Sequence, residues 1–101
     1  MLEFIKQSAD GGTITYVASD GGNTIGECRL TLEGTDVFMT VSATAYENFV
    51  LASSVNAAAA FGLRVTAPCD GRLEKYGFVR DGDRMAARPA EIKFPSECGG
   101  N

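Results

Sequence analysis

The spacing of apolar residues first changes near Thr44. Before it, apolar and polar residues largely alternate, which places side chains on opposite faces of a strand. After it, apolar residues recur every three or four positions, the spacing that lines one face of a helix. A length of 101 residues is enough for one compact core. We therefore expect one α+β domain over residues 1–101.

The first half of the chain predicts an antiparallel meander. Three strand-like segments are separated by turns rich in glycine, asparagine and aspartate, at residues 13–18, 25–33 and 37–42. In the second segment, one face carries Cys28, Leu30 and Leu32. The third segment is apolar on both faces, which is typical of a central strand covered on both sides.

A helix and a parallel strand are predicted next. Thr44 and Glu47 match a capping box, in which the Thr44 side chain accepts from an amide of the first turn and the Glu47 side chain reaches back to the amide of Thr44. Gly62 ends the helix. Residues 63–67 form a short strand that stops at Pro68. A right-handed β-α-β connection would make this strand parallel to the third one.

Two further elements complete the order β-β-β-α-β-α-β-β: a short helix over about 69–76, closed by Gly77, and a C-terminal hairpin over 78–87. Ile92 and Phe94 alternate and predict an additional edge strand. The two ends of the chain, residues 1–12 and 99–101, are expected to be weakly ordered.

Composition excludes several classes of function. Thirteen acidic side chains against nine basic ones give a net charge of −4, which argues against a nucleic-acid partner. The absence of histidine excludes Ser-His-Asp and Cys-His catalysis. We expect no metal site, because the three cysteines form no C-x-x-C pair: Cys28, Cys69 and Cys98. No apolar run of membrane length and no signal-like start is visible, so we expect no membrane association and a cytoplasmic location with free thiols.

The element order resembles that of the GNAT (N-acetyltransferase) superfamily. Three stretches carry the resemblance: the Ala-rich helix end Asn56–Gly62, the strand Leu63–Val65, and the helix with its Gly-Phe, Leu73–Phe78. The segment from Pro89 to Cys98 is also similar to the tail of short, reduced GNAT-like proteins. The resemblance covers about residues 13–98 and implies a minimal GNAT-like fold.

The resemblance also implies an acetyl-CoA site in a V-shaped opening between the two parallel strands. The pyrophosphate would lie on the N-terminus of the Ala-rich helix, where unpaired N–H groups and a partial positive charge favour an anion. The residues implied to bind acetyl-CoA are Val41, Ser42, Ala43, Thr44 and Ala45. An acetyl-CoA-dependent N-acetyltransferase is the activity that follows.

The chain departs from the family pattern at the expected site. Ser42 stands where the pyrophosphate loop has arginine or glutamine, and Ala45 and Glu47 stand where it has two small residues. Glu47 adds a negative charge that repels pyrophosphate. Leu73 replaces the tyrosine that protonates the departing thiolate, and Thr66 replaces an asparagine.

Three functions stay open at this stage. For an acetyltransferase, the catalytic candidates are Glu47 and Tyr76, with Glu27 or a water as another possible general base. The alternative is a non-catalytic GNAT-like module that binds another small ligand or a protein partner in the same cleft. The third is a structural protein that forms oligomers, for example a homodimer, through the exposed edge of the meander.

Overall fold

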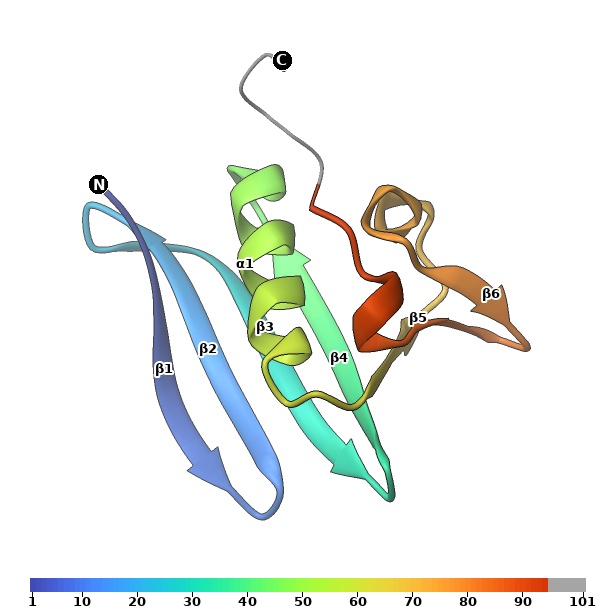
Figure 1. The fold of residues 1–101 in the computed structure, drawn as a ribbon. Coiled ribbons are helices and arrows are strands. Elements are labelled where there is room, and N and C mark those ends of the chain that lie inside the picture. The colour runs from blue at the N-terminus through green and yellow to red at the C-terminus, as the bar shows by residue number, and fades with distance from the viewer. Residues whose placement is uncertain (95–101) are drawn as a thin grey trace.

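A mixed seven-stranded sheet with one α-helix forms the body of the molecule (Figure 1). The fold is that of a computed structural model of the chain, which describes residues 1–94. The sheet has the order β1-β2-β3-β4-β5-β7-β6. The strands are β1 (Leu2–Asp10), β2 (Thr13–Asp20), β3 (Asn23–Glu33), β4 (Asp36–Ala43), β5 (Arg64–Pro68), β6 (Val79–Asp81) and β7 (Arg84–Ala87). The helix is α1 (Glu47–Ala59), and η1 (Gly71–Tyr76) and η2 (Pro89–Glu91) are short 3₁₀ helices.

The first four strands are antiparallel neighbours. On β3, Cys28 and Leu30 are buried, whereas Leu32 on the same face is 49% exposed. Residues 1–12 were expected to be weakly ordered, whereas Leu2–Asp10 pairs with β2 as strand β1, with a bulge between Lys6 and Ser8. Glycines at positive φ in the tight turn, Gly11 (59°) and Gly12 (84°), allow this pairing.

The predicted capping box at the start of α1 is wrong. The Thr44 hydroxyl donates to the carbonyl of Ile25 on β3 at 3.3 Å and does not bond an amide of the helix. Tyr46 is the N-cap residue, with φ 50° and no side-chain bond to the helix. The helix therefore begins at Glu47, three residues after the predicted cap. At its other end, Gly62 has the positive φ (69°) expected of a helix stop.

The C-terminal part keeps the predicted hairpin but not the predicted edge strand. The hairpin β6–β7 adds to β5 through β7, so β7 lies between β5 and β6. Residues 92–94 are not a strand, because the Lys93 amide donates to the carbonyl of Tyr76 at the end of η1 (2.8 Å). The expected weak order at residues 99–101 lies outside the described residues.

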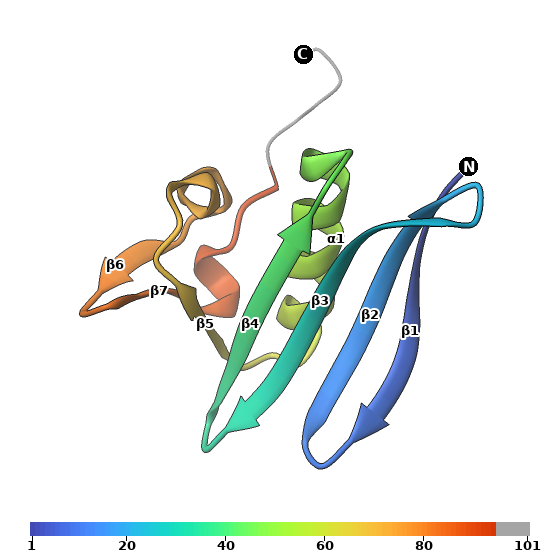
Figure 2. The same cartoon turned by 180° about the vertical axis from the view of Figure 1, so that it is seen from behind.

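The core lies between α1 and one face of the sheet. Leu51, Val55 and Ala58 of α1 pack against buried residues of the central strands, including Leu30 and Met39. The opposite face carries no helix where β2, β3 and β4 cross it (Figure 2). The prediction that β4 is covered on both sides is therefore wrong. On this uncovered side Phe38 is half-buried, and the guanidinium of Arg84 lies 4.2 Å from its ring centroid.

The helices of this structure are short. The longest helix within residues 1–94 is α1 with 13 residues, and no helix there has the length and apolarity that a membrane crossing requires.

Candidate functional site

The site begins where the two parallel strands separate. β4 and β5 pair at three positions only, from Asp36↔Arg64 to Phe38↔Thr66, although β4 continues to Ala43. Beyond these pairs lies a cavity of about 120 Å³, which we call the β4–β5 cavity. Its walls come from β4, α1, the end of β5 and η1, and include Met39, Val41, Leu51, Cys69, Asp70 and Leu73. A water molecule takes about 30 Å³ of liquid, so the cavity suits a group of about four heavy atoms.

Side chains of η1 reach the first turn of α1 beside this cavity. Arg72 donates to the carboxylate of Glu47 and, through Nε, to both oxygens of Asp70 (2.9 and 3.0 Å). Lys75 donates to Asn48 at 2.9 Å. The Arg72 guanidinium lowers the pKa of Asp70, and the two carboxylates raise the pKa of Arg72. Glu47 therefore lies in an ion pair, so its charge at the helix start is partly compensated.

The first turn of α1 keeps its amides available. Within residues 1–94, the amides of Glu47, Asn48 and Phe49 have no hydrogen-bond acceptor, because Thr44 is turned to Ile25 and Tyr46 does not cap. Such a turn carries part of the positive end of the helix dipole.

The residues that the resemblance assigned to acetyl-CoA lie at different places in the structure. Val41 is half-buried and lines the β4–β5 cavity. Ser42 is exposed on the opposite face of the sheet, and Ala43 is half-buried. Thr44 and Ala45 are exposed in the connection to α1. Only Val41 of this set lines the cavity itself.

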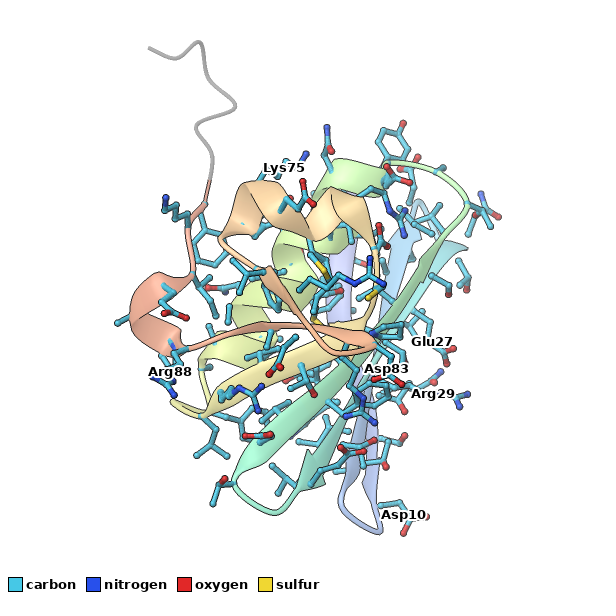
Figure 3. The ribbon with its side chains drawn as sticks, turned by 90° about the vertical axis from the view of Figure 1, so that its right-hand side faces the viewer. Asp10, Glu27, Arg29, Lys75, Asp83 and Arg88 are labelled. Atoms are coloured by element: carbon cyan, nitrogen blue, oxygen red, sulfur yellow. The ribbon has the colours of Figure 1, made fainter. Side chains whose placement is uncertain are left out.

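A second concavity lies on the face of the sheet turned away from α1. We call it the β3–β4 groove; it has a volume of about 300 Å³ and is lined by Glu27, Arg29, Thr40, Val41 and Ser42. Glu27 and Arg29 lie side by side and point away from the α1 side of the sheet (Figure 3). Thr40 and Val41 line both the groove and the β4–β5 cavity, so the two concavities adjoin at these residues.

The predicted catalytic residues are not brought together. Tyr76 is 1% exposed, packs edge-on against Phe94 and does not line the β4–β5 cavity, whereas Leu73 does. Glu47 is exposed and bonded to Arg72 beside the cavity. Glu27 lies on the β3–β4 groove.

Sequence reasoning did not single out Asp70, Arg72 or Arg29. Asp70 caps η1 by accepting from the amide of Arg72 at 2.9 Å, and an aspartate two residues before an arginine at a helix start is a signal that could have indicated it. The alternation of β3 groups Arg29 with Glu27 on one face, but it contains no sign of a groove. The groove forms only because Thr40, Val41 and Ser42 of β4 lie beside these residues.

The two described thiols differ in their surroundings. Cys28 is fully buried, and this burial raises its pKa to about 11. Cys69 is exposed at the wall of the β4–β5 cavity. Within residues 1–94, no three histidine, cysteine, aspartate or glutamate side chains are grouped as they would be around a metal ion.

Two solved structures share this arrangement of elements. One, described as the acetyltransferase of GNAT family from Streptococcus pneumoniae, superposes with a TM-score of 0.62 over 80% of this chain and 68% of that one. The chain has a GNAT-like fold. The other, an acyl-CoA N-acyltransferase from Pseudomonas aeruginosa, superposes on the same GNAT-like fold with a TM-score of 0.58 over 75% of this chain and 67% of that one.

The likeness concerns the fold, because both structures are 17% identical to this chain. No protein-family model matches the sequence, and a search of curated proteins finds no match. The similarity therefore lies in the fold and is not detected in the sequence.

Proposed function

We propose that the protein binds an acetyl-CoA-type thioester at the β4–β5 cavity and transfers its acyl group to an amine. The single observation that carries the proposal is the early end of the β4–β5 ladder, with a cavity between the separated strands of a GNAT-like fold. Strand edges that do not pair leave backbone N–H and C=O groups for a ligand. The two solved structures named above are described as acyl-transfer enzymes.

The size of the cavity fits the reacting end of such a donor. A volume of about 120 Å³ accepts an acetyl group and its sulfur but not a nucleotide, so the rest of the donor would lie outside. The uncapped amides at the start of α1 are suited to its phosphates. Arg72 keeps Glu47 paired beside them, which reduces the repulsion that the sequence alone suggests.

Glu27 is the residue that we propose as the general base. It lies on the β3–β4 groove, which meets the cavity at Thr40 and Val41, so an acceptor amine in the groove can face a thioester in the cavity. In the transfer, the amine nitrogen forms the new bond to the acyl carbon and the carbon–sulfur bond breaks. The proton lost by the nitrogen passes to Glu27 or water and ends on the sulfur.

Filling the cavity tests this proposal. Val41→Phe places a larger side chain at the cavity wall, so acetyl-CoA binding in calorimetry should weaken at least tenfold relative to the natural chain. Val17→Phe is the matched control: Val17 is also a half-buried strand valine, but it lines neither concavity. Binding that is equal in both variants, or absent from the natural chain at millimolar acetyl-CoA, would refute the proposal.

A non-catalytic binding module is the second candidate. The observation that favours it is Leu73 at the cavity wall, where the family's tyrosine would protonate the sulfur, together with the burial of Tyr76. This candidate expects acetyl-CoA binding without formation of acetylated amine. Mass spectrometry of a panel of small amines, incubated with the protein and acetyl-CoA, separates the two functions. Leu73→Tyr should then raise transfer only if the missing acid is what limits it.

A further inference from the structure

The β3–β4 groove has one acidic side chain, Glu27, and one basic side chain, Arg29, and both have hydrogen-bonding atoms without a partner in the described part of the protein. Nη2 of Arg29 lies 3.5 Å from Oε2 of Glu27. Within residues 1–94, no other protein group pairs with either side chain. Oε1 of Glu27 and Nε and Nη1 of Arg29 therefore remain for a ligand.

The floor of the groove is polar and fixed by the strand register. Glu27 lies opposite Ser42 and Arg29 lies opposite Thr40, so each charged side chain has a hydroxyl beside it on the neighbouring strand. The strands are part of the central sheet, which holds the four positions without a loop. A rigid frame of this kind fixes the backbone positions from which the two charged side chains extend.

The spacing of the two charges selects a ligand class. A ligand with an ammonium and a carboxylate on the same carbon has its nitrogen and carboxylate carbon about 2.5 Å apart, as backbone geometry gives. The farther carboxylate oxygen of such a ligand lies about 3.6 Å from its nitrogen. This distance matches the 3.5 Å between Nη2 of Arg29 and Oε2 of Glu27. Laid across the pair in the opposite sense, the ammonium bonds Glu27 and the carboxylate bonds Arg29.

We propose that the β3–β4 groove is an acceptor site for a small α-amino acid, with Arg29 as the residue that selects its carboxylate. The proposal rests on the proposed function for the role of acceptor, since the groove meets the cavity at Thr40 and Val41. It adds the substrate class: a zwitterion of about amino-acid size in a groove of about 300 Å³.

Three matched probes test the binding without any acyl donor: L-alanine, ethylamine and propionate. In two-dimensional NMR of the whole chain, L-alanine should shift the amides of residues 27, 29, 40 and 42 in a saturable way. Ethylamine and propionate should bind about tenfold more weakly or worse, because each loses one charge-assisted hydrogen-bond partner. Equal responses to all three probes, or no saturable shift with L-alanine, would overturn the proposal.

Variants assign the two charges separately. Arg29→Ala should weaken L-alanine binding about tenfold and leave ethylamine unchanged, whereas Glu27→Gln should weaken both. Arg80→Ala is the control, because Arg80 is also an exposed strand arginine but does not line the groove. If Arg29→Ala and Arg80→Ala have the same effect, Arg29 has no selecting role and the proposal fails.

Transfer kinetics distinguish this proposal from the proposed function. With acetyl-CoA present, kcat/KM should be higher for L-alanine than for ethylamine, and Arg29→Ala should remove the difference. Saturable L-alanine binding without acetyl-CoA binding would refute the proposed function, but the β3–β4 groove would still be a binding site for an α-amino acid. Acetyl-CoA binding with equal transfer rates for both amines would support the proposed function and refute the selection of α-amino acids by the groove.

Discussion

Gly77 joins η1 to the strand that follows, and its replacement should be unusually costly. Its φ is 93°, a region in which residues with a Cβ are disfavoured. A Cβ added there would lie 2.1 Å from the carbonyl oxygen of Glu91 in η2, closer than any real contact. Because that neighbour is backbone, η2 would have to move, and the bond from Lys93 to Tyr76 would be strained with it.

Gly82 separates the two contributions. It also has a positive φ (68°), but a Cβ there meets nothing within 4 Å. Gly82→Ala should therefore cost only the backbone strain, about 1–2 kcal/mol. Gly77→Ala adds a steric term of about 1–3 kcal/mol, so its total cost should be about 2–5 kcal/mol.

Urea unfolding followed by circular dichroism measures both costs, and thermal unfolding gives a second estimate. In a domain of this size, each kcal/mol corresponds to a fall in Tm of about 4–8 °C. We expect Gly77→Ala to lie clearly below Gly82→Ala in both experiments, with similar urea m-values. Equal losses would refute the reasoning, since they would mean that η2 does not pack on Gly77 in solution.

Three further predictions concern the core, a buried thiol and the cap of η1. Leu30→Ala should cost about 2–5 kcal/mol by leaving a cavity, whereas Leu32→Ala, at a half-exposed position on the same face, should cost under about 1 kcal/mol; equal losses in urea would contradict the observed burial. Burial raises the pKa of Cys28 to about 11, so the folded chain holds this proton more tightly and stability should fall as the pH rises from about 9 to 11. In Cys28→Ala the stability should fall less over this pH range, and identical pH profiles of the two chains would refute the contribution of Cys28. Asp70→Ala should cost about 1 kcal/mol at pH 7 through loss of the cap. The pKa of Asp70 is lowered by Arg72, so this cost should shrink below about pH 4, and a pH-independent cost would point to packing instead.

Local patterns account for most of the elements that the sequence predicted. The alternation of β3 and the glycine turns around it depend on neighbours in the chain, and so does the helical stop at Gly62. These signals are visible in sequence because a strand face or a tight turn requires particular residues at fixed spacing. The open cleft itself came from the resemblance and not from any local pattern.

The features that were missed depend on distant partners. Four of the nine residues of β1 are apolar, but they do not alternate regularly with polar residues, and its pairing with β2 through the tight turn forms the strand. The capping-box prediction was wrong because Thr44 donates to a carbonyl on β3 and Glu47 accepts from Arg72, 25 residues further along the chain. A side chain with two possible partners takes the one that the tertiary fold brings near, and a short motif cannot contain that information.

The two edge strands of the sheet, β1 and β6, affect how readily molecules aggregate. An unpaired strand edge is a template for polymerisation between molecules. β1 is interrupted by a bulge between Lys6 and Ser8, which bends the edge and increases its twist. β6 at the opposite edge is only three residues long, and two of them, Arg80 and Asp81, are charged. Both edges thus discourage fibre growth, and deletion of Gln7, which would straighten β1, is the change that should turn this chain towards fibrils.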